Sequence, residues 1–466
     1  MPPADTTELS IPALRAAFDG KVIAPSDTEY DQARAVFYGA FDRRPSAIVQ
    51  VKDAADVATV VSVARDTGAE LTIRSGGHSV AGHSMTDGGI VIDLFQMRAL
   101  DIDVAQRTAW AETGLTAGEY TNATAAHGLA TGFGDTASVG IGGITLGGGV
   151  GYLVRKYGLT IDDLLAADVV TADGQIVRTD AEHHPDLFWA IRGGGSNFGV
   201  ATRFQYRLRD VDTIVGGMLM LPATPDLVTR FIAEAEAAPD ELTTILNVMV
   251  APPMPFVPAE HHGELIMMAL LAYTGPTDAG ERAIAPFRAL ATPLADMIQP
   301  MPYPQLYQMM EGGPEAVAQE QARSTFVDDL DQGRAEAILE HLRTSTAPMA
   351  VAQLRVLGGA MARVPVDDSA FAHRQRRIMI AAGAVYEDAT DTPVHEAWVD
   401  SLAAAVRQGE PGVYVNFLGN EGAARVREAY PGPTWDRLRR IKATYDPTNL
   451  FRLNHNIPPA TEGTEP

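Results

Sequence analysis

The chain has 466 residues, 59 of them acidic and 36 basic, which gives a net charge of −23, and it contains no cysteine. This length exceeds what one hydrophobic core usually supports, so we expect two domains or one large composite structure. A surface this acidic repels phosphate backbones and anionic lipid, which argues against nucleic acid and membranes as partners. The lack of cysteine excludes disulfides, thiolate nucleophiles, iron–sulfur clusters and Cys-based zinc sites.

The N-terminus, "MPPADTTELS", has no basic region followed by an apolar run, so no secretory signal is predicted. No stretch approaches about 20 uninterrupted apolar residues, the length that a membrane-spanning helix needs. We therefore expect a cytoplasmic enzyme.

The first 210 residues alternate between helical and strand patterns. Residues 52–68 predict a helix with Asp53 as N-cap and Gly68 as its end. Residues 115–128 predict a second helix, which opens with the capping box Thr116-x-x-Glu119. Short buried strands are expected in 69–77 and 88–94, a hairpin around Asp173-Gly174 in 167–179, and a helix, glycine turn and strand in 184–208.

Beyond about residue 211 the glycine clusters fade, and longer amphipathic patterns replace them. Residues 224–241 and 331–348 predict helices, and residues 243–250 and 263–275 predict strands. We expect an antiparallel sheet covered by helices in residues 211–405, and a C-terminal segment, 406–466, that returns to the first domain. Residues 297–314, rich in Met and Pro, are predicted to be a long loop.

Three glycine clusters stand in the first 200 residues, at Gly76–Gly77, Gly147–Gly149 and Gly193–Gly195. Glycine permits positive φ and lets an anion approach bare N–H groups. Three such loops together suggest a long ligand with a pyrophosphate at its centre. The chain has neither G-x-G-x-x-G nor G-x-x-x-x-G-K-[ST], so a dinucleotide would not lie in a Rossmann crevice or a P-loop.

Four ordered motifs then resemble a known family. They are "RSGGHSVAGHS", "SVGIGGITLGGGVGYLVRKYGLTIDDL", "DLFWAIRGGGSNFGV" and "YDPTNLFRLNHNI". Together they are similar to the berberine bridge enzyme-like FAD-linked oxidases of the vanillyl-alcohol oxidase superfamily, which include bacterial 6-hydroxynicotine oxidase-like members. The resemblance covers nearly the whole chain. It implies an α+β fold, with a two-part PCMH-type FAD-binding domain in 1–210, a substrate domain in 211–405 and a berberine bridge enzyme-like segment in 406–466.

By this resemblance, Ser75 to Ser79 surround the FAD pyrophosphate, and His78 is bonded to the 8α-methyl carbon of the flavin. Imidazole is a nucleophile near neutral pH and the flavin methyl is electrophilic, so such a bond is chemically reasonable. His83 is the competing histidine. We interpret it as a turn residue, because it lies outside the S-G-G-H core of the motif.

Two further positions carry implications of the resemblance. Many relatives have a cysteine bonded to flavin C6 where this chain has Thr136, so a single covalent link is expected. Val139 stands where the family places a gate for oxygen, and valine there goes with oxidases, whereas leucine goes with dehydrogenases.

The candidate base is Tyr414, in the family pattern Y-x-N, and Asn416 would hold the flavin edge. A phenol with a pKa near ~10 needs that pKa lowered to act as a base at neutral pH. Tyr414 is therefore expected to be the base or a substrate hydrogen-bonding group, and the alternative is a ring that only packs over the flavin. Residues 378–382, where some relatives carry a Glu or Gln base, offer no ionisable group.

The full set of expected FAD contacts is larger than these few positions. It comprises Arg74, Ser75, Gly76, Gly77, His78, Ser79, Thr136, Val139, Gly140, Gly142, Gly143, Leu146, Gly147, Gly148, Gly149, Gly151, Gly199, Val200, Asn416, Asn454 and Asn456.

The predicted function is that of an FAD-dependent oxidase, which passes hydride from a small or medium organic substrate to flavin and electrons to O2, giving hydrogen peroxide. Alcohols, amines, sugars and phenolic metabolites are compatible substrates, and Met301 to Met310 are expected to line an apolar pocket for them. The alternatives are a flavin dehydrogenase with another acceptor and a catalytically silent flavin-binding protein. No metal site is expected, because the adjacent pairs His183-His184 and His261-His262 cannot face one ion.

Overall fold

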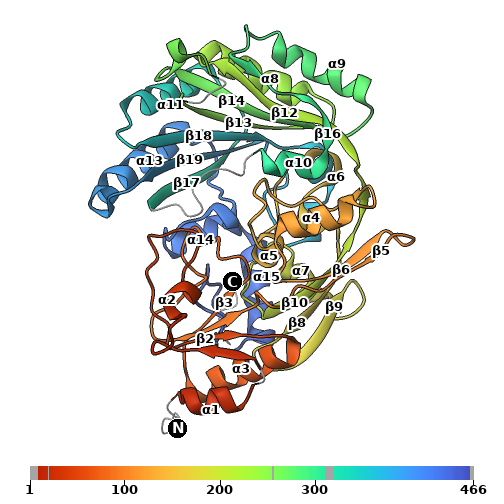
Figure 1. Ribbon diagram of the computed structural model, residues 1–466, viewed down its shortest axis with the longest axis vertical. Helices are drawn as coiled ribbons and strands as arrows, with labels where there is room; N and C mark the ends of the chain where they lie inside the picture. Colours follow the sequence, from red (N-terminus) through yellow and green to blue (C-terminus); the bar gives the residue numbers. More distant parts are fainter. Residues whose placement is uncertain (1–8, 19, 254–256, 310–318, 462–466) are drawn as a thin grey trace.

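The computed structural model describes residues 9–18, 20–253, 257–309 and 319–461. Three larger sheets and one two-stranded sheet form its framework, with helices packed around them (Figure 1). Most strand pairs are antiparallel, and four long helices gather on one face of the largest sheet. The predicted α+β class is confirmed.

The first sheet has four strands in the order β1-β2-β4-β3, and its central pairs are parallel. Helix α3 packs against it; Asp53 caps the helix and Gly68, at φ 71°, ends it, as predicted. The elements are α1 (Ile11–Ala16), β1 (Lys21–Ile23), α2 (Tyr30–Ala33), β2 (Ala47–Gln50), α3 (Ala54–Thr67), β3 (Leu71–Arg74) and β4 (Ile90–Asp93).

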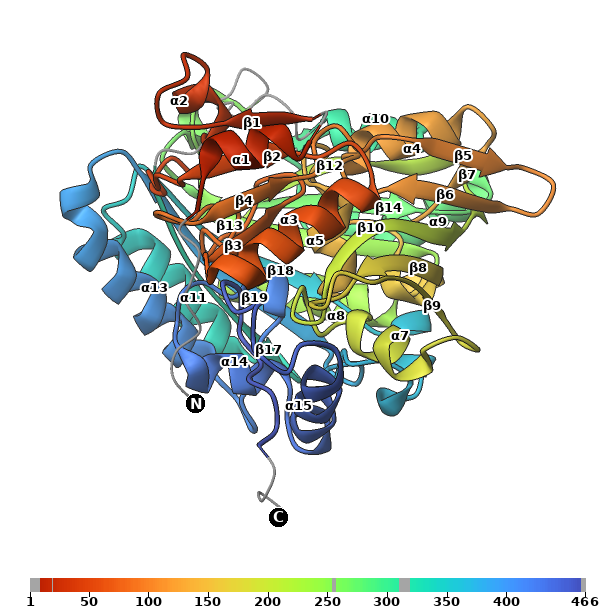
Figure 2. The ribbon, with the colours of Figure 1, turned by 90° about the horizontal axis from the view of Figure 1, so that it is seen from below.

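The second sheet is antiparallel, with five strands in the order β5-β6-β10-β8-β9. It lies below the largest sheet in the view of Figure 1, and beside the first sheet when the molecule is seen from below (Figure 2). The predicted hairpin is β8–β9, and the predicted capping box opens α4. The elements are β5 (Leu100–Asp103), β6 (Thr108–Glu112), α4 (Ala117–Ala125), α5 (Ile141–Leu146), α6 (Val154–Tyr157), the 3-10 turn Thr160–Asp162, β8 (Leu164–Val170), β9 (Ile176–Asp180), α7 (Pro185–Ile191) and β10 (Val200–Arg207), with β7 (Leu129–Ala130) and β11 (Arg209–Asp210) as the small sheet.

The third sheet has eight strands and is antiparallel throughout, with the order β15-β12-β14-β13-β18-β19-β17 and β16 beside β12. The predicted strands 243–250 and 263–275 are neighbours in it. Its strands are β12 (Thr213–Pro222), β13 (Leu242–Val250), β14 (Leu265–Tyr273), β15 (Ala295–Asp296), β16 (Gln299–Pro302), β17 (Gln319–Val327), β18 (Met349–Val356) and β19 (Ile378–Tyr386). All of them fall within 211–405, although the domain limits themselves stay a prediction.

Amphipathic helices cover the outer face of this sheet and leave the inner face directed at the first 210 residues (Figure 1). The core between helices and sheet includes Phe231, Phe287, Ile338 and Leu402, all buried. The covering helices are α8 (Pro225–Ala237), α9 (Thr277–Arg288), α11 (Gln332–Thr344) and α13 (Thr392–Val406), and the shorter α12 (Gly359–Arg363) follows β18.

The C-terminal segment packs against the core of the second sheet. Leu438 and Ile457 share that core with Leu187 and Trp189 of α7. The segment consists of the 3-10 turn Val415–Phe417, α14 (Ala423–Ala429) and α15 (Pro433–Tyr445), followed by an extended tail.

The loop prediction for residues 297–314 is wrong over its described part. Strand β16 pairs with β12, and α10 (Tyr303–Gln308) follows it. Tyr303, Leu306 and Tyr307, at helical spacing, are buried, and Pro304 fits the first turn of a helix. The proline and methionine content therefore led to a loop prediction for a short, well-packed helix. Residues 310–314 lie outside the described residues.

Among the described residues, no helix combines the length and the apolar character that a membrane crossing requires.

Candidate active site

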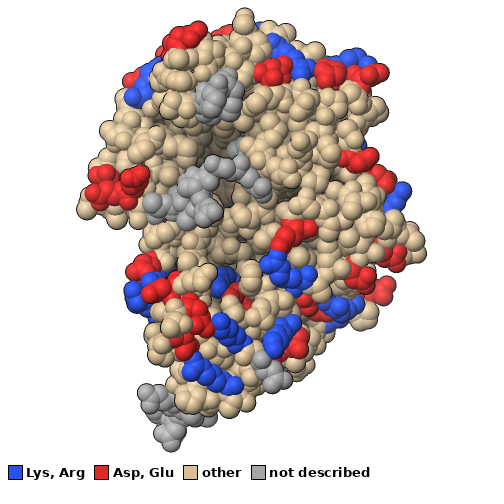
Figure 3. All heavy atoms as spheres, in the orientation of Figure 1, with Lys and Arg blue, Asp and Glu red and all other residues tan. Residues whose placement is uncertain are grey.

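A cavity of about 500 Å³ lies between the inner face of the large sheet and the two smaller sheets. Figure 3 shows the surface hollowed between these two halves of the molecule, with few charged side chains at the rim of the hollow. The predicted catalytic residue Tyr414 lines this cavity. Most of the predicted FAD contacts line it too: Ser75, Gly76, Gly77, His78, Ser79, Thr136, Val139, Gly140, Gly142, Gly143, Leu146, Gly199, Val200, Asn416 and Asn454.

The loop after β3 meets the N-terminal end of α5 at the cavity wall. A Cβ atom at Gly76 would lie 2.2 Å from the Gly140 nitrogen, so the backbones touch in a way that only glycine allows. The Ser75 hydroxyl donates to the Thr113 carbonyl at 2.6 Å and accepts from the Gly142 N–H at 3.3 Å. Two segments nearly 70 residues apart thus form one cradle of small residues and backbone groups.

His78 projects from this cradle and stacks on Phe37, with ring centroids 4.2 Å apart and planes at 24°. Burial lowers the pKa of His78 to about 4. The imidazole is therefore neutral at physiological pH and keeps a nitrogen lone pair.

His83 also lines the cavity but has a different neighbour. Its ring lies edge-on to His455 of the tail, 4.6 Å between centroids, and burial lowers its pKa to about 3. Its backbone N–H donates to the Ser79 hydroxyl and its carbonyl accepts from the Thr72 hydroxyl. These contacts agree with a turn histidine.

Several predicted contacts do not line the cavity, and the glycines among them serve packing instead. A Cβ atom added to Gly147 would lie 2.0 Å from Asn416 Oδ1. One added to Gly149 would lie 1.9 Å from Thr160 Oγ1, and one added to Gly151 would lie 1.7 Å from the Phe133 carbonyl oxygen. Gly148, at φ 129°, faces Phe371. In this structure these glycines allow the turn to approach its neighbours closely, and direct contact of the cluster with an anion stays a prediction.

Arg74 and Asn456 are likewise absent from the cavity lining. Arg74 is paired with the buried Asp93 at 2.6 Å, which ties β3 to β4. The Asn456 side-chain oxygen is buried without a hydrogen-bond partner among the described residues, but it lies outside the cavity lining.

Two positions of the loop before α5 face the cavity, as predicted. Thr136 has its hydroxyl 3.5 Å from the Asp135 carboxylate. The Val139 carbonyl accepts from the Ala117 N–H at 2.9 Å, which fixes the backbone that carries the valine side chain.

Tyr414 is buried with its hydroxyl already engaged. It accepts hydrogen bonds from the Gly149 N–H and the Asn416 amide, each at 2.9 Å, and Asn416 also donates to the Ile144 carbonyl at 3.1 Å. Burial raises the pKa of Tyr414 above its ordinary value. A neutral-pH base needs a lowered pKa, so this geometry does not favour Tyr414 as the base.

The C-terminal tail supplies an acceptor to the cavity. The Asn454 amide donates to the carbonyls of Ser196 and Phe451, both at 3.2 Å. Its side-chain oxygen is buried and has no partner among the described residues, although Asn454 lines the cavity. An unpaired buried oxygen in such a place is suited to a ligand N–H or O–H group.

The floor of the cavity is the inner face of β18, β19 and β17. A hydrogen-bonded chain crosses it: Gln353 donates to Asn247 at 3.0 Å, and Arg355 donates to Gln353 at 2.8 Å and to Asp135 at 2.6 Å. The chain holds these polar side chains in fixed orientations beside small residues of β17 and β19: Ala322, Ser324, Ala381 and Gly383.

Glu320 on β17 also lines the cavity, and the sequence analysis missed it. Burial raises the pKa of its carboxyl to about 7. The signal in the sequence was weak, because only the pairing of β17 with β19 shows that Glu320 belongs to the inner face.

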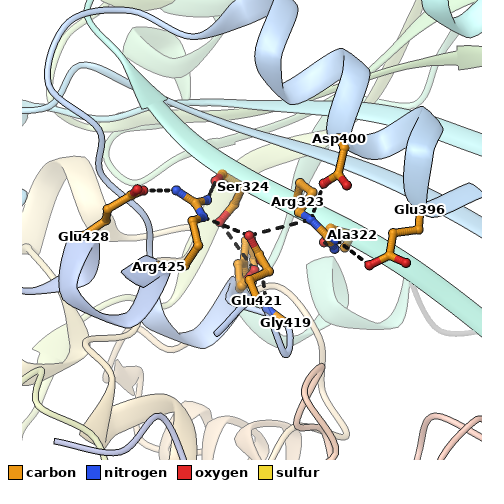
Figure 4. A network of polar contacts seen from close by, with 10 residues as sticks. Ala322, Arg323, Ser324, Glu396, Asp400, Gly419, Glu421, Arg425 and Glu428 are labelled. Atoms are coloured by element: carbon orange, nitrogen blue, oxygen red, sulfur yellow. Dashed lines mark hydrogen bonds and ion pairs between the residues drawn. The ribbon is translucent and has the colours of Figure 1, made fainter. Parts of the chain in front are cut away.

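An ion-pair network anchors the C-terminal segment beneath this floor (Figure 4). Arg323 of β17 binds Asp400 at 2.6 Å and Glu396 at 3.0 Å on α13. Glu421, nearly buried, contacts both Arg323 and Arg425, and Arg425 also donates to the Ser324 carbonyl. The network joins β17 and α13 to the C-terminal segment that carries Tyr414.

The prediction of an apolar pocket from Met301 to Met310 is wrong in its described part. Met301, Leu306 and Tyr307 are buried in a core cluster with Tyr152 and do not line the cavity. Met310 lies outside the described residues.

Comparison with known proteins agrees with this site. Residues 45–180 match the model of an FAD binding domain, and residues 413–458 match the berberine and berberine-like model. The chain is 30% identical to (R)-6-hydroxynicotine oxidase of Paenarthrobacter nicotinovorans, over 96% of this chain and 98% of that one.

Solved structures show the same architecture. Crystalline 6-hydroxy-D-nicotine oxidase from Arthrobacter nicotinovorans superposes with a TM-score of 0.86 at 28% identity, covering 95% of this chain and 98% of that one. Berberine bridge enzyme-like protein 28 from Arabidopsis thaliana gives a TM-score of 0.81 at 26% identity, covering 94% and 98%.

Proposed function

The chain belongs to the berberine bridge enzyme-like family of FAD-linked oxidoreductases, and on that basis we propose that it is an oxidase whose FAD is bonded to His78 alone. Bound FAD supplies the hydride acceptor and returns electrons to O2, giving hydrogen peroxide. The observation that carries the proposal is the neutral, stacked His78 on the glycine loop that borders the cavity.

The residues present fit FAD. The cradle of Ser75, Gly76, Gly140 and Gly142 would hold its phosphates with backbone groups, and Gly143 leaves open space where a side chain would intrude. The unpaired Asn454 oxygen would accept a hydrogen bond from the cofactor. Asn416 would hold the flavin edge from the C-terminal segment.

The single attachment follows from residue chemistry. The low pKa of His78 keeps its ring nitrogen unprotonated and nucleophilic, whereas Thr136 has no thiolate to offer a second link. His83 is the alternative attachment point, but it lies against His455.

Val139 lines the cavity, and valine at the matching position goes with oxidases in this family, whereas leucine goes with dehydrogenases. This valine therefore supports O2 as the electron acceptor. The alternatives are a dehydrogenase that reoxidises slowly in air and a flavin-binding protein without turnover. Stopped-flow mixing of the reduced protein with air-saturated buffer distinguishes the dehydrogenase, because its reoxidation would take minutes or longer.

The substrate is proposed to be a small or medium organic molecule that carries a C–H next to an alcohol or amine group. Small side chains on the floor leave room for a ring, which favours an aromatic or alicyclic compound over an oligosaccharide. The relative named for 6-hydroxynicotine makes cyclic amines the first compounds to test. A panel of cyclic amines, benzylic alcohols, phenols and oligosaccharides, scored by anaerobic flavin bleaching, would identify the class.

The attachment is tested by acid precipitation and peptide mass spectrometry. Tryptic cleavage after Arg74 and Arg98 releases a peptide with both His78 and His83, so the His78→Ala and His83→Ala variants are needed beside fragment spectra. We expect FAD to remain on this peptide in wild type and in His83→Ala, and to wash off His78→Ala. Flavin that washes off the wild type would refute the covalent link, and protein without any flavin would refute the oxidase.

A further inference from the structure

Glu320 is a carboxylate that faces the cavity without a partner. It is half-buried in the cavity lining and forms no hydrogen bond or ion pair among the residues that the structure describes. Its neighbour Arg323 points to Glu396, Asp400 and Glu421 instead.

The strand register determines which residues lie beside Glu320. Ala322 and Ser324 lie on the same face of β17 as Glu320, and they pair with Gly383 and Ala381 of β19. A Cβ atom at Gly383 would lie 3.9 Å from the Glu320 carboxylate oxygen. Small residues therefore leave space beside this oxygen on the cavity floor.

The charges around Glu320 do not neutralise it. Tyr38, from the N-terminal segment, lines the cavity as well, and its pKa is raised mainly by burial and further by the charges of Glu320 and Asp135. The two arginines that line the cavity are paired with other carboxylates, Arg355 with Asp135 at 2.6 Å and Arg323 with Asp400 at 2.6 Å. A carboxylate in this setting retains a high proton affinity, and its pKa of about 7 is suited to accept a proton near neutral pH.

We propose that Glu320 is the base of the reaction, an inference that rests on the proposed oxidase function. The substrate loses a hydride from carbon to the bound flavin and a proton from its O–H or N–H to the Glu320 carboxylate, so a C–O or C–N single bond becomes double. O2 then takes up the two electrons together with two protons, one of them returned by Glu320, and leaves as hydrogen peroxide. The substrate class is thus an alcohol or amine with an ionisable X–H group next to the reacting carbon.

The first test needs no substrate. Infrared difference spectra of the FAD-loaded protein between pH 5 and 9 should contain a protonated-carboxyl band that disappears near pH 7. The band should be absent in Glu320→Gln and retained in Glu387→Gln, an exposed carboxylate just beyond β19. A band unchanged in Glu320→Gln, or one that titrates below pH 5, overturns the inference.

The second test follows flavin reduction by the panel compound that bleaches the wild type. Glu320→Gln should slow reduction by at least about 100-fold with a smaller change in KM, and Glu320→Asp should restore part of the rate. Dithionite should reduce the flavin equally fast in all variants, because it does not depend on the base, and this control shows that the flavin itself is intact.

The outcomes separate the two proposals. Reduction of Glu320→Gln at a rate close to wild type overturns the role of Glu320 and leaves the oxidase standing. If no panel compound reduces the wild type, the oxidase proposal fails and the role of Glu320 fails with it, even when the infrared band titrates as expected.

Discussion

Lys442 and Asp446 form an ion pair without solvent exposure at the end of α15, with Nζ and Oδ2 2.6 Å apart. Lys442 also donates to the carbonyls of Asn197 and Phe451, and both of these residues line the cavity. Asp446 accepts the N–H groups of Leu450 and Phe451. The buried ion pair therefore fixes the position of the C-terminal tail, and this tail carries Asn454.

Replacing Lys442 with Met should lower the free energy of unfolding by about 3–5 kcal/mol, because it leaves Asp446 buried and unpaired. Urea unfolding measures the loss. Lys21→Met, which breaks an exposed pair with Glu29, is the control and should cost about 1 kcal/mol or less. Equal effects of the two variants would contradict the structural role of Lys442.

Gly76→Ala should abolish retention of FAD, because the new methyl group would lie 2.2 Å from the Gly140 nitrogen and force the two loops apart. The ratio of flavin to protein absorbance after gel filtration checks this. Gly333→Ala, on the exposed first turn of α11, should keep a full flavin content. A normal flavin content in Gly76→Ala would show that the loops of Gly76 and Gly140 can move apart without loss of FAD binding.

Tyr414→Phe should reduce the rate of flavin reduction by less than about tenfold, because the hydroxyl accepts two hydrogen bonds and its pKa is raised by burial. It should lower stability by about 1–3 kcal/mol, because two buried donors lose their acceptor. Rapid-reaction kinetics and thermal unfolding measure the two effects. A loss of several orders of magnitude in rate would restore Tyr414 as the base.

Val139→Leu should slow reoxidation of the reduced flavin by O2 by about tenfold or more, a barrier increase of about 1.4 kcal/mol. Flavin reduction by substrate should change much less, since the added methylene narrows access for O2 and leaves the base untouched. Stopped-flow absorbance in the two half-reactions checks this. Equal slowing of both half-reactions would mean that Val139 shapes the substrate site instead.

His373 should contribute to acid destabilisation. Burial lowers its pKa from 6.5 to about 4, so between these values the unfolded chain binds a proton that the folded protein does not. Its contribution to stability is complete above pH 6.5 and is lost as the pH falls towards 4. Glu320 has the opposite effect on stability. Burial raises its pKa from 4.5 to about 7, so between these pH values the folded protein binds a proton that the unfolded chain does not, and its contribution to the free energy of unfolding grows as the pH falls.

His373→Gln keeps a side chain that can donate to the Glu428 carbonyl, which the imidazole contacts at 3.0 Å. The drop in unfolding free energy between pH 7 and pH 5 should be about 1–2 kcal/mol smaller in this variant than in wild type. Urea unfolding at both pH values tests it. An identical drop would show that His373 is not kept neutral by burial.

Elements with local signals could be predicted from the amino-acid sequence. Asp53 and Gly68 bound α3, Thr116 and Glu119 open α4, and alternating or helical hydrophobic patterns locate strands and helices of the large sheet. The S-G-G-H motif also indicated that the loop of His78 borders a ligand cavity, because glycine density of that kind has few other physical uses.

The chemistry of the cavity floor depends on contacts between distant segments, which the sequence pattern does not reveal. The raised pKa of Tyr414 depends on burial among residues from distant parts of the chain, such as Val150 and Phe371. The glycines at 147–149 pack against Asn416, Phe371 and Thr160 instead of lining the cavity. Glu320 becomes a site residue because β17 pairs with β19 in one register, and a shift by one residue would turn its carboxylate to the opposite face. Burial, pairing and proton affinity are properties of neighbours that the fold brings together, and the local pattern does not contain them.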